Sequence, residues 1–268
     1  MMLRSVFGKT LWERRRSIIW WMLGMAALAF LTVAFWPSLR DQAGLGDFLE
    51  SFPPELLALF GIENAQELLT PAGFVSSRLY ASIGPILLTV FGISVGTSVM
   101  AGEEDRGTMD ILLAQPVSRR RLVLDGAAAM TVLVSIVAAA LLAVLFATNP
   151  IFDLGFSGSA IVAANVGITL LALLHGALAL AVGGITGNRG LTLGVATAVV
   201  VFGWFINALA EIVDELKPVQ EISPFHWFLQ GTPLARGWDW PANALMAAVT
   251  VALVVIAVWA FERRDVAT

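Results

Sequence analysis

The sequence contains no cysteine in its 268 residues, and only 13% of it is charged. The missing cysteine excludes a disulfide framework, a thiolate metal site and a cysteine nucleophile. The scarcity of charge excludes a water-soluble enzyme, because soluble domains carry about 25% charged residues. The hydrophobic content of 58% and the mean hydropathy of +0.82 instead indicate a membrane protein.

Six apolar blocks are long enough to cross a bilayer, since a helix needs about 20 residues to span its hydrocarbon core. They are residues 17–36, 83–101, 127–147, 160–185, 191–210 and 242–261. Strands of a membrane barrel would alternate apolar and polar residues, whereas these blocks are unbroken. The sequence therefore predicts an all-α helical membrane protein, a single transmembrane domain over residues 1–268 with six transmembrane helices.

The basic residues predict the orientation of these helices. Twelve of the sixteen Lys and Arg residues fall on the side that holds both termini and the loop 102–126. Because basic residues favour the cytoplasmic side, we expect the N- and C-termini to be cytoplasmic. Segments 37–82 and 211–241 then lie outside. We expect the first to hold short helices, and the tryptophans of the second to anchor it at the membrane interface.

The six blocks contain no Asp, Glu, Lys or Arg, so they offer no charged site for the coupling ion of a proton- or sodium-driven carrier. Polar candidates for a substrate path are His175, Asn165 and Asn207. We expect each of them to form a hydrogen bond between helices, contact with a cargo being the alternative. The pairs Gly92 with Gly96 and Gly183 with Gly187 have the G-x-x-x-G spacing that allows close helix packing.

The N-terminal arm, residues 1–16, has an amphipathic pattern. Leu3, Val6, Phe7 and Leu11 share one face of a helix, and most of the basic residues lie off that face. Such a helix lies in the headgroup plane of a membrane. We therefore expect an interfacial helix here, the alternative being a simple basic flank of the first span.

The inner loop 102–126 predicts a short helix between two spans. Thr108 is a candidate N-cap, Pro116 a stop, and Ser118 a candidate cap for the next helix. A helix over 108–115 would place an apolar patch, Met109, Leu112 and Leu113, on one face. Such a patch calls for a protein surface or the membrane to cover it; if it is already covered, the loop is only a capped connector.

From Gly102 to Arg119 the loop reads G-E-E-D-R-G-T-M-D-I-L-L-A-Q-P-V-S-R. It closely resembles the first cytoplasmic loop of permeases of the type-2 ABC transporters (ABC-2 family), with the pattern G-E-x-x-x-G-T-[LM]-[ED]-x-L-L-x-x-P-[VI]-[ST]-R. The tail 261–265, F-E-R-R-D, resembles the F-x-R-R-D ending of that family, and residues 223–225 resemble its S-P-F element. The resemblance covers most of the chain. Where the family often has Gly-Lys, this chain has Asp125-Gly126.

The resemblance implies a permease subunit of an ATP-driven exporter, with an interfacial elbow helix and a cytoplasmic coupling helix. In the family the coupling helix sits in a groove of a separate ATPase subunit. Met109, Leu112 and Leu113 would fill that groove, and residues 103–106 would form a polar rim. The implied coupling residues are Glu103, Glu104, Asp105, Arg106, Gly107, Thr108, Met109, Asp110, Leu112, Leu113, Pro116, Ser118 and Arg119.

The same resemblance implies the partners and the location of the chain. Two ABC ATPase subunits would bind ATP and Mg, and this chain would bind no cofactor of its own. A second permease subunit would be a copy of this chain or a paralogue. The location would be the inner membrane of a bacterial or archaeal cell, in contact with the lipid bilayer, and we expect no nucleic-acid partner.

Two alternatives belong to other functional classes. An ATP-independent carrier or channel would need a coupling-ion site or a polar pore, in which the spans are poor. An intramembrane protease is suggested by Glu103 and Glu104 with Arg106, His175 and His226, which resemble the E-E-x-x-x-R and histidines of CAAX-type proteases. The arginine spacing differs, and the glutamates and His226 are predicted on opposite faces of the membrane.

Overall fold

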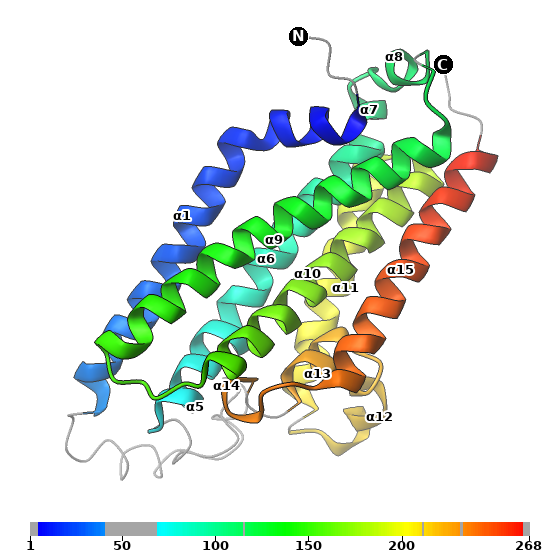
Figure 1. The fold of residues 1–268 in the computed structure, drawn as a ribbon. Helices are drawn as coiled ribbons and strands as arrows, with labels where there is room; N and C mark the ends of the chain where they lie inside the picture. Colours follow the sequence, from blue (N-terminus) through cyan, green and yellow to red (C-terminus); the bar gives the residue numbers. More distant parts are fainter. Residues whose placement is uncertain (1–4, 41–68, 115, 211, 231–232, 265–268) are drawn as a thin grey trace.

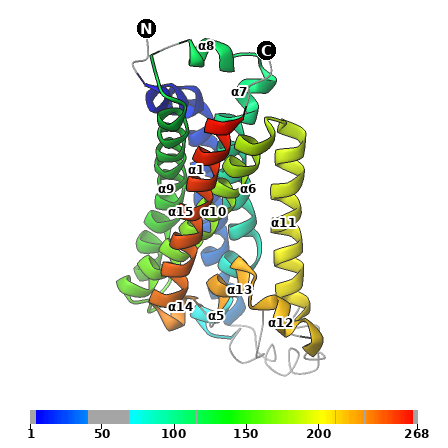
Figure 2. The same ribbon diagram turned by 90° about the vertical axis from the view of Figure 1, so that its right-hand side faces the viewer.

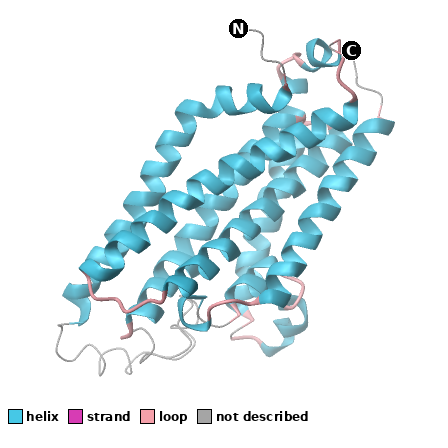
Figure 3. Ribbon diagram, in the orientation of Figure 1, coloured by secondary structure: helices cyan, strands magenta, loops and turns pink. Residues whose placement is uncertain are grey.

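The structure is a computed structural model that describes residues 5–40, 69–114, 116–210, 212–230 and 233–264. All regular elements within these ranges are helical (Figure 3). Six helical segments of this part of the chain are long and apolar enough to cross a membrane. They are α1 (Val6–Arg40), α5–η1–α6 (Pro71–Val99), α9 (Arg119–Ile151), α10 (Gly158–Thr186), α11 (Arg189–Leu209) and α15 (Trp240–Arg263). The predicted all-α class with six spans is confirmed.

The long helices run side by side, and short helices gather at the two ends of the bundle (Figure 1). One end, called the inner end below because we predict it to be cytoplasmic, holds α7 (Ala101–Asp105), α8 (Met109–Leu113), the beginning of α1 and the end of α15. The opposite, outer end holds α5, α12 (Lys217–Gln220), α13 (Pro224–Leu229) and α14 (Pro233–Arg236).

Helix α10 is the centre of the bundle. It packs against α6 (Gly84–Val99), α9, α11 and α15, and most of its side chains are buried. Helix α11 forms one edge of the bundle (Figure 2), where Phe202 and Phe205 are exposed. Large apolar side chains on the outside of a bundle are suited to contact with lipid.

Two glycines bring α6 and α10 together. A Cβ atom at Gly92 would collide with the backbone oxygen of Ala172, and one at Gly96 with that of Gly176. This pair packs as its spacing predicted. The pair Gly183 with Gly187 does not: Gly183 lies against Ala101, while Gly187 ends α10 with a left-handed φ of +64°. Gly187 therefore serves as a helix C-cap, a position that favours glycine.

The N-terminal arm is the first part of α1 rather than a separate helix. In Figure 1 these first turns cross the inner end before α1 turns along the bundle. Val6 and Leu11, from the predicted apolar face, pack against the two buried clusters of the protein. Trp12 is exposed, and the Arg15 guanidinium lies 3.9 Å from the centroid of its ring. The apolar face of the arm is thus partly covered by the protein itself.

The second span begins earlier than expected, at Pro71 instead of residue 83. The Thr70 hydroxyl accepts a hydrogen bond from the Gly73 N–H (3.0 Å) and caps α5 (Pro71–Val75). The next segment, η1 (Ser76–Ile83), is wound as a π-helix, and its polar Ser76 and Ser77 are buried. These serines and the exposed Arg78 that follows them break the apolar run on which the prediction depended. Short helices were expected over segment 37–82, of which residues 41–68 lie outside the described residues.

Segment 211–241 places two short helices, α13 and α14, against the core. Phe225 of α13 is fully buried, and its ring lies 5.6 Å from that of His175 in the middle of α10. Trp238 donates to the Ser159 hydroxyl (3.1 Å) and stacks on Trp240 (ring centroids 4.7 Å apart). The segment is held to the bundle through both its apolar and its indole groups.

Candidate functional site

The loop with the family pattern projects beyond the inner end of the bundle (Figures 1 and 2). Helix α6 ends at Val99, and Met100, with φ −113° and ψ −80°, breaks the helix so that α7 takes a new direction. Gly107, with φ +66°, makes the turn into α8. A residue with a Cβ atom would be strained in that conformation.

Glu103 is the best-connected side chain of the loop, and it is buried. Its carboxylate accepts from Lys9 Nζ of α1 (2.6 Å), from Arg106 (2.5 Å) and from the Thr108 hydroxyl (2.6 Å). Burial by itself raises the pKa of the Glu103 carboxyl. The hydrogen bonds from Lys9 and Thr108, with the charges of Lys9 and Arg106, outweigh that effect and lower the pKa.

Two predicted roles are corrected by these contacts. The Thr108 side chain does not cap α8; it donates to Glu103 instead, because the turn at Gly107 brings the two residues together. Glu103 does not lie in the expected polar rim, because its carboxylate is buried and forms ion pairs with Lys9 and Arg106.

The two following acids pair with two further elements. Glu104 forms an ion pair with Arg264, just after α15, and Asp105 pairs with Arg189 at the start of α11 (3.1 Å). Three consecutive carboxylates therefore contact the arm of α1, the end of α15 and the turn between α10 and α11. Of the expected rim residues, Asp105 and Arg106 are exposed.

The apolar residues of α8 face in two directions. Met109 is 2% exposed and belongs to a buried cluster with Val99, Leu122 and Phe261, against which Leu112 and Leu113 also pack. Ile111 is 64% exposed. The expected patch of Met109, Leu112 and Leu113 thus holds α8 on its own bundle.

Ile111 lies off the predicted patch, and the sequence pattern itself separates it from the other apolar residues of α8. An apolar stripe at i, i+3 and i+4 marks the face of a helix that packs on the protein. The large apolar residue off that stripe is the one that stays exposed.

The end of the loop joins α9 to α15. The Ser118 hydroxyl accepts from the Arg121 N–H (3.3 Å), so Ser118 caps α9 as expected. Arg119 donates to the backbone oxygens of Phe261 (3.1 Å) and Arg264. Arg119 therefore contacts its own chain, while Asp110 and Pro116 are exposed.

The candidate path residues do not gather at one point. His175 Nδ1 donates to the Leu171 oxygen of its own helix (2.8 Å), so it does not form the expected bond between helices. His175 Nε2 and Asn165 Oδ1 are buried and have no hydrogen-bond partner among the described residues. Asn207 accepts from Gln220 of α12 (3.3 Å). Of the three candidates, His175 and Asn165 keep an unpartnered polar atom inside the bundle, as do the hydroxyls of Tyr80 and Thr97 elsewhere in the described residues.

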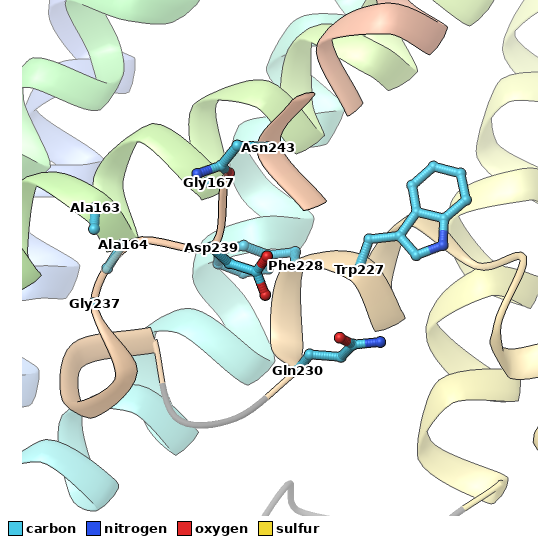
Figure 4. A pocket seen from close by; sticks show the side chains of 9 residues that line it. All are labelled: Ala163, Ala164, Gly167, Trp227, Phe228, Gln230, Gly237, Asp239 and Asn243. Carbon is cyan, nitrogen blue, oxygen red and sulfur yellow. The ribbon is translucent and has the colours of Figure 1, made fainter. Parts of the chain in front are cut away.

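A small hollow at the outer end was not foreseen from the sequence (Figure 4). Small residues of α10 form one wall, aromatic residues of α13 another, and polar side chains from the start of α15 a third. Its lining residues are Ala163, Ala164, Gly167, Trp227, Phe228, Gln230, Gly237, Asp239 and Asn243. Asp239 also caps α15 by accepting from the Ala242 N–H (3.1 Å).

The geometry gives no support to a protease. Glu103 and Glu104 lie on α7 at the inner end, and His226 lies on α13 at the outer end, where it is bonded to Gln230 (2.8 Å). Within the described ranges, His, Asp and Glu side chains form no group of three that could hold a metal ion.

Residues 4–266 match the sequence profile of the ABC-2 family transporter proteins. The chain belongs to this family. It is therefore a multi-pass membrane permease of an ABC transporter, a class of membrane subunit that associates with ABC ATPase subunits. A comparison with curated proteins finds no match.

Proposed function

We propose that this permease is driven by a separate ATPase subunit that docks on α8, with Ile111 and Asp110 at the centre of the contact. The observation that carries the proposal is the division of α8 into two faces. Met109 fixes one face to the bundle, and Ile111 on the other is 64% exposed beyond the inner end. An isolated apolar side chain on a rigid helix suits a groove on a partner protein.

The attachment of α7 and α8 to the bundle supports the same proposal. A movement of the ATPase can reach the spans only if α8 is connected to them. Helix α8 is connected to α7 through the turn at Gly107 and to the bundle through its buried cluster. The ion pairs of Glu103 and Glu104 then fix α7 to α1 and to the residue after α15. The turn after α10, residues 186–190, would make a second and smaller contact with the ATPase.

The wider assembly follows from the family resemblance. Two ATPase subunits would bind ATP and Mg and would act on two permease subunits, the second being a copy of this chain or a paralogue. The inner membrane of a bacterial or archaeal cell would be the location, and export the direction. The spans fit an external energy source, because the six apolar blocks contain no Asp, Glu, Lys or Arg that could bind a coupling ion. Arg78, before the second block, is exposed.

His175 and Asn165 are the residues proposed to contact the cargo. Both are buried in α10, the central helix, and each keeps one polar atom without a partner in the described structure. An unpaired polar atom in a buried site is costly, and a hydrogen bond from a cargo would remove that cost.

A binding experiment tests the docking face. We expect Ile111→Asp to abolish co-purification of the ATPase with the permease, because a carboxylate would be buried in an apolar groove. Ile222→Asp is the matched control, since Ile222 is also largely exposed (72%) but lies after α12 at the outer end. Equal recovery of the ATPase with both variants would contradict the proposal.

A further inference from the structure

We propose that Lys9 and Arg264 are positioning residues for coupling, because they tie α1 and α15 to α7. A displacement of α8 would then reach the first and last spans directly, and not only α6 and α9, to which the loop is joined in sequence. The proposal rests on the proposed function, since it concerns how a push on α8 is distributed. Neither residue belongs to the loop itself: they lie 94 and 160 positions from their partners.

The degree of burial separates these two ion pairs from the third. The side chains of Glu104 and Arg264 are 16% and 18% exposed, and those of Glu103 and Lys9 6% and 25%. Asp105 and Arg189 are 49% and 54% exposed. Exposed pairs contribute little because water screens them, whereas removing one partner of a sheltered pair leaves an uncompensated charge. The pairs of Glu103 and Glu104 are therefore the ones that can keep α1 and the end of α15 in contact with α7 when α8 is displaced.

Arg264 contacts three other helices, α7, α9 and α10. Its guanidinium pairs with Glu104 of α7 and donates to the Gly183 oxygen of α10 (3.3 Å), and its backbone oxygen accepts from Arg119 of α9. A side chain at Gly187 would collide with both Glu104 and Arg264, so the left-handed glycine after α10 leaves the space for this pair.

An apolar contact runs beside the ion pair. Phe261, in the last turn of α15, is fully buried in the same cluster as Met109, and Leu112 and Leu113 pack against that cluster. Helix α8 is thus linked to the end of α15 by packed side chains and, through α7, by charge. Coupling between sites needs a continuous physical connection of this kind.

The test uses the permease assembled with its ATPase in lipid vesicles, and measures the ATP hydrolysis that depends on the permease. The variants are Arg264→Glu, Glu104→Arg and the double exchange of the two. Each single variant is expected to lose roughly 5- to 100-fold of this activity, the usual range of coupling between sites, while the ATPase still co-purifies. The double exchange should recover most of the loss, because it restores opposite charges.

Arg263→Glu is the matched control, because Arg263 is the adjacent arginine but is exposed and lies over the Trp259 ring (4.2 Å). It should hydrolyse ATP like the wild type. Activity of Arg264→Glu equal to that of the control would overturn the inference and leave the proposed function intact. A wild-type permease that binds no ATPase would overturn both.

A variant that fails to fold is distinguished by its melting temperature. Should Arg264→Glu be unfolded, Lys9→Gln tests the same idea on the other pair without placing like charges together. The Lys9→Gln permease is expected to bind the ATPase and to lose permease-dependent ATP hydrolysis. Arg16→Gln is its control: Arg16 lies on the same helix but is exposed, so this variant should keep the activity. Wild-type activity of a folded Lys9→Gln permease would overturn the inference.

Discussion

Lys9 and Glu103, 94 positions apart in the chain, form a 2.6 Å ion pair that fixes the beginning of α1 to α7. The pair lies at the inner end, where Arg106 and Thr108 complete the hydrogen bonding of the carboxylate. It joins the arm to the loop, the two inner segments with the clearest sequence patterns.

The pH dependence of stability tests this pair. The lowered pKa of Glu103 means that its contribution is fully present above the ordinary pKa of glutamate, about 4.3, and is lost as the pH falls through the lower value in the folded protein. We expect the melting temperature of the wild type to fall between pH 7 and pH 3 by more than that of Glu103→Gln. Glu262→Gln, at an exposed carboxylate, should follow the wild type; equal acid sensitivity of all three would contradict the pairing.

The packing of α6 on α10 gives a second prediction. Gly92→Ala should destabilise the permease by roughly 1–3 kcal/mol, because the added Cβ overpacks the contact with Ala172. Gly24→Ala on α1, where nothing lies within 4 Å of an added Cβ, should be neutral or stabilise by up to about 1 kcal/mol. Thermal unfolding in detergent compares the two, and a similar effect of both substitutions would refute the close approach.

Substitutions on the two faces of α8 should have different consequences. Ile111→Asp should change the free energy of unfolding by no more than about 0.5 kcal/mol, as is usual for exposed positions, and should still lose the ATPase. Leu112→Asp should lower both stability and binding, because Leu112 packs against the buried cluster that includes Met109. The measurement is a melting curve beside a pull-down for each variant. A fully stable Leu112→Asp protein would show that the two faces have been assigned the wrong way round.

His175 provides a test of the cargo path. His175→Phe should leave stability unchanged or raised, because it removes a buried nitrogen without a partner in the described structure and keeps an aromatic ring beside Phe225. It should lower transport, because the atom proposed to meet the cargo is gone. Transport at the wild-type rate by a stable His175→Phe permease would remove His175 from the path.

The fold could be predicted from the sequence wherever apolar residues alone decide it. Unbroken blocks gave all six spans, but α5 and η1 were not predicted as part of the second span, because Ser76, Ser77 and Arg78 interrupt the apolar run. The direction of the arm across the inner end follows from its contacts with the bundle, which no local pattern contains.

The candidate site was predicted in position but not in detail. The loop pattern located α8 and the cap at Ser118 but not α7, while the roles of Met109 and Thr108 depended on which way each side chain turns. Lys9, Arg189 and Arg264 could not be found, because only the fold brings such distant residues to the three acids of α7.

The most direct test of the central claim uses the absence of native cysteine. Ile111→Cys would introduce one reactive thiol on α8, and a membrane-impermeant thiol reagent would be added to inside-out vesicles and to intact cells. The account predicts labelling in the inside-out vesicles, protection when the ATPase is bound, and no labelling in intact cells. Labelling from outside the cell, or labelling in the vesicles that the bound ATPase leaves unchanged, would contradict it.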